Sequence, residues 1–383
     1  MSSVTWLAPD LVFDGEVLRP GLVLGVQGGH VAHLLAREAV PEGAHVRPLN
    51  GIVSPGFIDL QVNGGGDVLV NDAPTPERLA RIIAAHHRLG TVGLLPTVIT
   101  DAPGAIDRAA RAVRAGWGMP GLLGLHIEGP HIAPARRGTH ASGYVRPLEE
   151  STIALVEDLR AAGIPVMITL APEAATGQGI GRLAATGAIV SIGHSDATAE
   201  EVRASLAAGA RCFTHLFNAM SPMLNRAPGV VGAAINSTAY AGIICDGHHV
   251  ADEMVGLAIR ARPEPDRMFL VSDAMPTVGG GDRFSLYGAE IRMENGRLVN
   301  AEGSLAGAHV TMAEGVARLI GTVGVAPEVA LRMAVTVPAR LIGRPDLATL
   351  EGREVADLVL LDDGFAYRGS LAQGLPAVTP APR

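Results

Sequence analysis

The chain has 383 residues, of which 48% are hydrophobic, and carries 30 basic against 38 acidic side chains. This length allows two domains, or one large domain with a smaller one. The net charge of −8 and the absence of any block of like charges argue against general binding to nucleic acid. No apolar run approaches the roughly 18 residues that a membrane-spanning helix needs, so neither nucleic acid nor a membrane is an expected partner.

The absence of lysine and the scarcity of cysteine exclude several kinds of catalytic and metal site. All 30 basic residues are arginine, which excludes a Schiff-base lysine, a P-loop lysine and a carboxylated lysine bridging two metals. Cys212 and Cys245 are the only cysteines, too few for a disulfide scaffold or a cysteine-rich zinc site. No basic residue precedes Arg19, so the first residues do not resemble a signal peptide. We therefore expect a cytoplasmic protein.

The two ends of the chain share one pattern. Residues 1–55 contain short apolar runs separated by turns such as Asp14-Gly15 and Gly28-Gly29, which is typical of antiparallel strands. A similar run, residues 358–361, precedes the turn at Asp362-Asp363-Gly364. We predict a small β-sandwich domain assembled from residues 1–55 and 341–383.

Between the ends, apolar runs alternate with segments of helical length. Continuous apolar runs are typical of strands covered on both faces, as in a parallel sheet. Eight such runs predict a (β/α)8 TIM-type barrel over residues 56–340, with a doubly wound open sheet as the alternative. The runs are 57–62, 93–100, 122–128, 166–171, 189–194, 212–217, 241–245 and 268–272, and the helical segments include 77–89, 105–115, 152–162, 199–208 and 252–261.

The residues that could bind a metal or take part in catalysis lie where the apolar runs end. Active sites of such barrels lie at the carboxyl ends of the strands, so this placement favours the barrel. Polar residues repeated at these positions would be an odd coincidence for core side chains. They are Gln61, Asn63, Glu128, His194, His215, His249 and Asp273.

Three of these residues match a metal site. Taken singly, Glu128 is more simply a loop carboxylate, and His194 or His215 a hydrogen-bonded histidine. Together, one glutamate and two histidines match the three-ligand catalytic zinc pattern, which leaves a position for water. Asp273, after the eighth run, would alone be a helix cap. Beside such a site it is placed to act as general base and acid.

The motifs as a set resemble the N-acetylglucosamine-6-phosphate deacetylase family of the amidohydrolase superfamily. The resemblance extends over essentially the whole chain, through residues 305–307 and 337–340 to the closing strands. The motifs that carry it are residues 55–64, 126–130, 138–140, 193–195, 214–220, 226–229, 246–250 and 272–274.

The resemblance implies a role for each matching residue. Glu128, His194 and His215 match the metal ligands, and Asp273 matches the catalytic acid/base. His249 matches a residue that contacts the substrate and polarises the acetamido carbonyl. Arg226 matches an arginine that reaches the phosphate from a neighbouring subunit, which implies a homodimer. The substrate contacts implied in full are His140, Asn218, Ala219, Arg226, His249, Leu305 and Ala306.

The number of metals follows from the first predicted barrel strand. Many amidohydrolases have His-x-His there, whereas this chain has Gln61-Val62-Asn63. Glutamine and asparagine are poor ligands for a divalent transition metal, so Gln61 and Asn63 mark at most the remnant of a second metal position. We predict one divalent metal per subunit. Zinc is the first choice, and Fe, Co, Ni and Mn also accept this ligand set.

The expected reaction is hydrolysis of N-acetyl-D-glucosamine 6-phosphate to glucosamine 6-phosphate and acetate. The phosphorylated amino sugar is then the small-molecule partner. Two substrate alternatives remain open on the same site, N-acetylgalactosamine 6-phosphate and an N-acyl amino acid. A different class also remains open, a sugar-phosphate isomerase or lyase in which the histidines carry protons.

Overall fold

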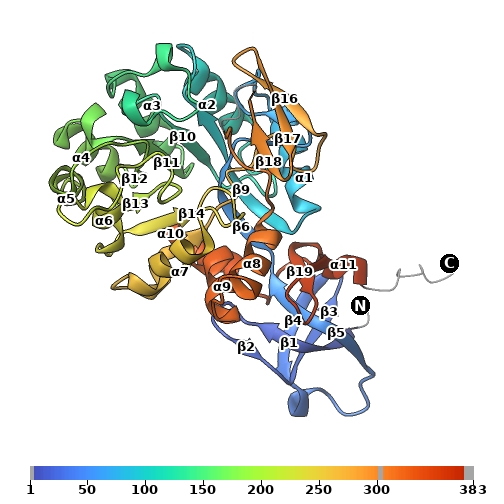
Figure 1. The fold of residues 1–383 in the computed structure, drawn as a ribbon. Coiled ribbons are helices and arrows are strands. Elements are labelled where there is room, and N and C mark those ends of the chain that lie inside the picture. Colours follow the sequence, from blue (N-terminus) through green and yellow to red (C-terminus); the bar gives the residue numbers. More distant parts are fainter. Residues whose placement is uncertain (1–3, 301–304, 375–383) are drawn as a thin grey trace.

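The computed structural model describes residues 4–300 and 305–374. Its larger part is a set of eight parallel strands, each hydrogen-bonded to the next in chain order (Figure 1). Each strand lies on one of the eight predicted apolar runs. The strands are β6 (Phe57–Val62), β9 (Thr91–Ile99), β10 (Leu125–Glu128), β11 (Val166–Leu170), β12 (Ile189–Ile192), β13 (Cys212–Phe213), β14 (Tyr240–Ile243) and β15 (Met268–Leu270).

The first and last of these strands approach each other and close the barrel. A parallel bridge joins Val62 to Ala274, and the backbone N–H groups of Asn63 and Gly64 both donate to the carbonyl of Ala274. All other neighbouring barrel strands share ladders of two or more residue pairs. The prediction of a (β/α)8 barrel is thus confirmed, and the open sheet is not formed.

In the described residues, an α-helix follows each barrel strand. The five predicted helical segments are confirmed to within two residues at each end. Threonine caps begin several helices, and Thr198 and Thr311 form complete capping boxes with Glu201 and Glu314. The helices are α1 (Pro76–His87), α2 (Ala105–Ala115), α3 (Glu150–Ala161), α4 (Gly177–Ala185), α5 (Ala199–Ala207), α6 (Gly229–Ile235), α7 (Asp252–Ala261) and α8 (Met312–Gly321), followed by α9 (Pro327–Ala334) and α10 (Thr336–Leu341).

Strands from both ends of the chain meet in one hydrogen-bonded sheet of seven strands, where the sequence analysis expected a β-sandwich. The link between the ends is β5, which pairs with β1 on one side and with β19 on the other. Figure 1 shows this sheet beside the barrel. Its strands are β1 (Thr5–Phe13), β2 (Leu18–Arg19), β3 (Leu22–Gln27), β4 (His30–Ala36), β5 (Val46–Pro55), β19 (Leu358–Leu361) and β20 (Tyr367–Ser370), and α11 (Leu371–Gly374) follows. We propose to divide the chain at 55/56 and 340/341, next to the end of β5 and within the last turn of α10.

A three-stranded antiparallel sheet after β15 was not predicted. It consists of β16 (Arg283–Leu286), β17 (Ala289–Glu294) and β18 (Arg297–Val299). Its buried side chains pack against residues near the carboxyl ends of the barrel strands, among them Ile99 and Met275. A short hairpin, β7 (Gly64–Gly65) with β8 (Val68–Leu69), lies next to this cluster. The additional sheet therefore packs at the end of the barrel where the predicted active site lies.

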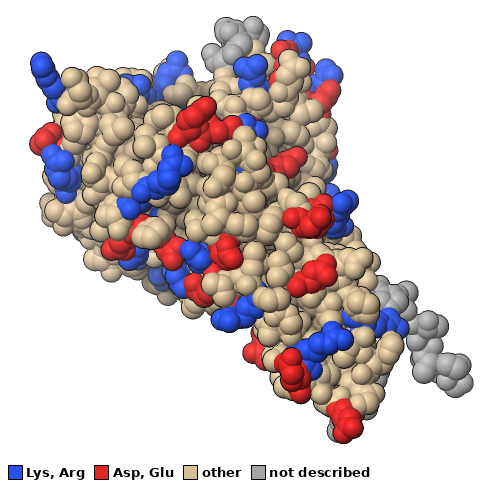
Figure 2. Space-filling view, turned by 60° about the horizontal axis from the view of Figure 1, so that its bottom comes forward, with Lys and Arg blue, Asp and Glu red and all other residues tan. Residues whose placement is uncertain are grey.

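The molecular surface carries both signs of charge. On the face in Figure 2, arginine and acidic side chains are interspersed over barrel and sheet domain, without a large field of one sign. Among the described helices, none combines the length and the apolar character needed to cross a bilayer.

Candidate metal centre and active site

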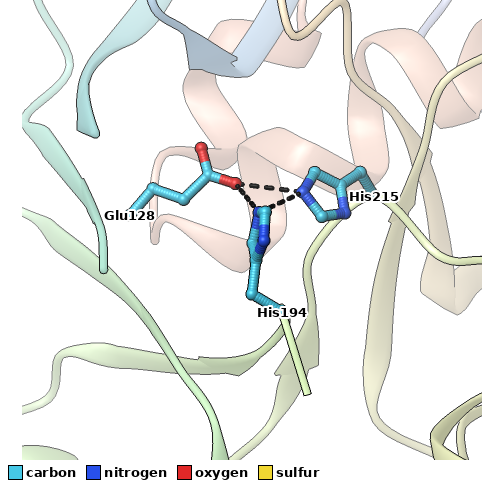
Figure 3. Close-up of side chains that lie close together, drawn as sticks. All are labelled: Glu128, His194 and His215. Carbon is cyan, nitrogen blue, oxygen red and sulfur yellow. Dashed lines mark hydrogen bonds and ion pairs between the residues drawn. The ribbon is translucent and has the colours of Figure 1, made fainter. Parts of the chain in front are cut away.

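Three predicted ligands meet at the carboxyl end of the barrel (Figure 3). Glu128 is the last residue of β10, and His194 and His215 each lie two residues beyond the ends of β12 and β13. The Oε1 atom of Glu128 lies 3.1 Å from Nε2 of His194 and 3.0 Å from Nε2 of His215, and the two Nε2 atoms are 3.0 Å apart. All three side chains are buried. In the described part of the chain, this is the one group of three or more such side chains able to hold a metal ion.

The backbone bends sharply where these side chains leave their strands. His194 has a φ of 49°, His215 of 28° and Asp273 of 52°, values that L-residues adopt rarely. Such conformations persist where the surrounding structure enforces them, and they cluster at functional sites. Here the turn directs three polar side chains over the barrel mouth instead of along the strand.

The arrangement of donor atoms fits a metal ion. The Nδ1 atom of His194 lies 2.9 Å from the backbone carbonyl of Arg136, which can only accept a hydrogen bond. The proton of a neutral His194 is therefore on Nδ1, and the Nε2 lone pair points to the other ligands. Two imidazole nitrogens and a carboxylate oxygen about 3 Å apart match the roughly 3.3 Å edges of a tetrahedral zinc site. We conclude that Glu128, His194 and His215 suit a divalent cation.

A layer of polar side chains lies in the barrel interior below the ligands. The Nδ1 atom of His126 lies 3.0 Å from the carbonyl of Leu60, and its Nε2 lies 2.7 Å from the hydroxyl of Thr169. The hydroxyl of Thr214 lies 2.6 Å from that of Thr169 and 2.7 Å from that of Ser191. These bonds connect β6, β10, β11 and β12 with the residue after β13, and so fix the strands that carry the ligands relative to one another.

Gln61 and Asn63 lie beside the candidate metal site as hydrogen-bond donors. Nε2 of Gln61 lies 3.2 and 3.1 Å from the two oxygens of Glu128 and 2.9 Å from Oδ1 of Asp273. Nδ2 of Asn63 lies 2.7 Å from the same Oδ1. The two amides therefore bind the carboxylates that a second cation would otherwise contact. The binding of one metal per subunit stays a prediction.

The electrostatic environment separates the two carboxylates. Burial opposes the charge of Glu128, but hydrogen bonds from His194 and His215 hold its pKa well below the ordinary value. Burial, and then the charge of Glu128, raise the pKa of Asp273 to about 6, against the lowering effects of His215, His249 and the Asn63 amide. A carboxylate with a raised pKa takes up a proton more readily, as a general base requires.

His249 is held by a carboxylate that the sequence analysis did not assign. Nδ1 of His249 lies 2.6 Å from Oδ2 of Asp246, whose other oxygen accepts the backbone N–H groups of His248 and His249. Although Asp246 is largely buried, these hydrogen bonds hold its pKa below the ordinary value. The spacing Asp-x-x-His within residues 246–249 was a signal that could have found this pair. Asp246 fixes the orientation of the His249 ring.

A cavity adjoins the candidate metal site. His140 borders it, and its Nδ1 lies 2.7 Å from the hydroxyl of Thr100, a partner that sequence reasoning missed. Burial, followed by the nearby His194, lowers the pKa of His140 to about 3, which keeps the ring neutral. The predicted site residues that line this cavity are Asn63, Glu128, His140, His194, His215, Asn218, Ala219, His249, Asp273 and Leu305.

Two predicted substrate contacts lie elsewhere. The side chain of Ala306 is fully buried in the cluster below β16–β18 and does not line the cavity. Arg226 is exposed on the loop before α6, where it lines a separate surface hollow with Thr198 and Leu224. Within one chain, the structure therefore does not bring Arg226 to the site.

The fold and the ligand set define a (β/α)8 barrel with a candidate site for one divalent metal at the carboxyl ends of its strands. Residues 52–379 match the family model described as "Amidohydrolase family". This match spans most of the chain, so the chain belongs to the amidohydrolase family.

Curated relatives show which members of this family the chain is similar to. An N-acetylgalactosamine-6-phosphate deacetylase from Shewanella sp. (strain ANA-3) is 39% identical over 90% of this chain and 86% of its own length. An N-acetylglucosamine-6-phosphate deacetylase from Haemophilus influenzae is 32% identical over 94% and 95%.

The crystal structure of N-acetylglucosamine-6-phosphate deacetylase from Pasteurella multocida covers 96% of this chain and 97% of its own, with a TM-score of 0.87 and 32% identity. The Mycobacterium smegmatis enzyme, as an aspartate-to-alanine mutant in complex with N-acetyl-D-glucosamine 6-phosphate, gives a TM-score of 0.85 at 31% identity, over 95% and 97% of the two chains.

Proposed function

We propose that this chain hydrolyses the acetamido group of N-acetyl-D-glucosamine 6-phosphate, giving glucosamine 6-phosphate and acetate. The observation that carries the proposal is the convergence of Glu128, His194 and His215 next to Asp273 at the mouth of a cavity. The relatives and solved structures named for this activity, similar over most of their length, support the choice of substrate.

The residues around the cavity have complementary tasks in this reaction. Glu128, His194 and His215 would hold a divalent cation, and the chemistry that it would supply is Lewis-acid activation of the attacking water and of the amide carbonyl. Asp273 takes the proton of the attacking water and then gives it to the departing amine nitrogen. The Asp246 carboxylate holds Nδ1 of His249 and so orients the ring, which leaves the Nε2 side of the ring to polarise the acetamido carbonyl oxygen.

We propose that His140, Asn218, the backbone of Ala219 and Leu305, all of which line the cavity, hold the sugar phosphate. Arg226 donates to the phosphate from a second copy, since it lies outside the cavity of its own chain and makes no hydrogen bond or ion pair with the described residues. Its planar fork matches a phosphate group. The active form is accordingly a homodimer. We propose zinc as the metal and the cytoplasm as the location, where both buried cysteines stay free.

N-acetylgalactosamine 6-phosphate is the second candidate substrate. The Shewanella relative, at 39% identity, is named for that epimer. The two sugars differ only in the configuration at C4, and the metal centre and Asp273 would treat their acetamido groups alike. Discrimination between them depends on the cavity wall.

Acetate release from both 6-phosphates, beside unphosphorylated N-acetylglucosamine and an N-acetyl amino acid, tests the proposal. The assay compares zinc-loaded with chelator-stripped protein. We expect metal-dependent release with a strong preference for a 6-phosphate, and the better epimer decides between the two candidates. Release from the amino acid alone would contradict the sugar substrate. Conversion of a sugar phosphate without acetate would indicate an isomerase or lyase.

A further inference from the structure

The junction that closes the barrel differs from all its other strand pairs. Between β6 and β15 the described residues contain the single bridge Val62–Ala274 and two N–H groups directed at the carbonyl of Ala274. This backbone contact lies beyond the carboxyl end of β15, which stops at Leu270. Below it, the two strands that flank the candidate base, Asp273, have no backbone ladder between them.

Side chains of β6 occupy this junction. The hydrogen bonds of Asp59, Gln61 and Asn63 all lead to the segment after β15, so these three side chains share the interior side of the junction. Asp59 contacts Ser272, whereas Gln61 and Asn63 both donate to Oδ1 of Asp273. Two side chains of the first strand, and the side chain of the residue directly after it, therefore bind two successive residues after the last strand.

Asp59 makes the deepest of these contacts. Its oxygens accept the backbone N–H of Ser272 at 3.3 Å, and its Oδ2 also accepts a short hydrogen bond from the Ser272 hydroxyl. Its Oδ1 accepts the N–H of Gln61 at 3.1 Å. The same Ser272 hydroxyl accepts the N–H of Ala274 at 3.1 Å, so the contact extends to both neighbours of Asp273.

The burial of Asp59 is costly and needs a reason. Its side chain is fully buried, its hydrogen-bond donors among the described residues are all neutral, and burial raises its pKa to about 7. A carboxyl group in such surroundings loses its hydration without gaining a cation. An apolar side chain would fill the position at lower cost, but it would leave the N–H and hydroxyl of Ser272 without an acceptor.

We infer that Asp59 is a positioning residue that sets the place and direction of Asp273 through Ser272. Asp273 leaves the strand with a φ of 52°, so its carboxylate direction depends on where the preceding residue is anchored. Asp59 supplies that anchor where the backbone ladder is missing. Gln61 and Asn63 then bind the carboxylate itself. The inference rests on the proposed function, because its readout is deacetylation.

The variants Asp59→Asn and Ser272→Ala test this inference. Each should lower kcat about 10²-fold, the order of effect that a misplacement of about 1 Å produces. KM for the phosphorylated sugar and the bound metal per chain should stay unchanged, since neither residue contacts the cavity or a metal ligand. Ser54→Ala is the control, because Ser54 is an equally buried serine, on β5, away from the junction. It should retain wild-type kcat.

Combining Asp59→Asn with Asp273→Asn distinguishes positioning from general damage. If Asp59 acts through Asp273, its replacement should cost little further in kcat once Asp273 is gone, so the two effects should not multiply. Multiplying effects, a kcat within threefold of wild type for both single variants, or a parallel loss of bound metal would each overturn the inference. If Asp59→Asn fails to fold, Ser272→Ala carries the same test. A wild-type protein that releases no acetate would instead contradict the proposed function.

Discussion

Asp273 receives hydrogen bonds from two amide groups on one oxygen, and its other oxygen makes no hydrogen bond within the described residues. Asn63 and Gln61 thereby fix the carboxylate plane. The second oxygen is left for a proton in transit. Burial and the neighbouring Glu128 raise the pKa of Asp273, so its environment combines a fixed direction with increased basicity.

The variant Asp273→Asn should keep this geometry, because the amide oxygen still accepts from Gln61 and Asn63. It removes the proton acceptor, so kcat should fall by about 10²–10⁴-fold while KM and bound metal stay close to wild type. Steady-state acetate release and metal analysis measure the three quantities. Asp282→Asn, an exposed aspartate before β16, should retain full activity. A tenfold loss or less in Asp273→Asn would remove Asp273 from this role.

His86 predicts a pH effect on stability that is separate from catalysis. It is fully buried in α1, and its Nε2 lies 2.9 Å from the carbonyl of Gly64. Burial lowers its pKa from 6.5 to about 4, against the raising effect of the hydrogen bond to that carbonyl. Above pH 6.5 the ring is neutral in both states. As the pH falls, only the unfolded chain takes up the proton, so stability is lost between pH 6.5 and 4.

At pH 4.5, His86 should cost the folded state about 2–3 kcal/mol relative to pH 7. His86→Gln keeps a donor for the Gly64 carbonyl but does not titrate. The variant should therefore lose less free energy of unfolding between pH 7 and pH 4.5 than the wild type, by that amount. Urea unfolding of metal-free protein at the two pH values measures it. Equal losses in both proteins would show that His86 is not buried neutral.

At the scale of elements, the part of the loop before α6 that carries Arg226 is expected to act on the site of a second copy. Arg226→Ala should raise KM for the 6-phosphorylated sugar about 10–100-fold, because a hydrogen bond to a charged group contributes about 1.5–3 kcal/mol. Its effect on unphosphorylated N-acetylglucosamine should be small. Arg203→Ala, on the neighbouring α5, is the matched control. Equal effects of Arg226→Ala on both sugars would assign Arg226 a structural role.

The barrel strands and most of the site could be predicted from the sequence, because the pattern that marks each of them lies within a short segment of the chain. The barrel strands are largely apolar because both their faces are covered, so their positions and their ends are visible in the chain. Residues at the ends of parallel strands meet at one face, which brings Glu128, His194 and His215 together.

The unpredicted elements lack that local signal. Strands β16–β18 are short and mostly exposed, and each of them buries a single side chain, namely Leu286, Ile291 or Leu298. One of their turns was nevertheless visible in the sequence, because Asn295-Gly296 is an Asn-Gly pair, which is a strong hairpin signal. In the structure, both residues of Tyr287-Gly288 and of Asn295-Gly296 have a positive φ. The contact between Asp59 and Ser272 depends on the register of strands more than 200 residues apart, which no local pattern encodes.

At the scale of the whole molecule, a metal bound by Glu128, His194 and His215 would connect three strands of the barrel. Removal of the metal by a chelator should abolish acetate release and lower the melting temperature, because a ligand bound only to the folded state stabilises it. Dialysis against zinc should restore both, with one equivalent bound per chain. Two tightly held equivalents would contradict the role of Gln61 and Asn63 as donors to carboxylates.

The proposed homodimer has a direct test in mixed subunits. In a heterodimer of Arg226→Ala and Asp273→Asn chains, one site combines an intact Asp273 with Arg226 of the other copy. Mixing the two variants under subunit exchange should therefore restore kcat/KM for the phosphorylated sugar well above the sum of the separate variants. The control is the Arg226→Ala homodimer taken alone through the same subunit exchange, which should recover no activity. No recovery on mixing would place Arg226 in the site of its own chain.

The seven-stranded sheet also fixes an order of events in the synthesis of the protein. β5 ends at residue 55, but its partner β19 begins at residue 358. At the about 5–20 residues per second of translation, the edge of β5 stays open for roughly 15–60 s, while the barrel is being made. An unpaired strand edge is a template for wrong pairing between chains. The first domain to leave the ribosome is thus the last to be completed, and the edge of β5 is open to wrong pairing until the final strands arrive.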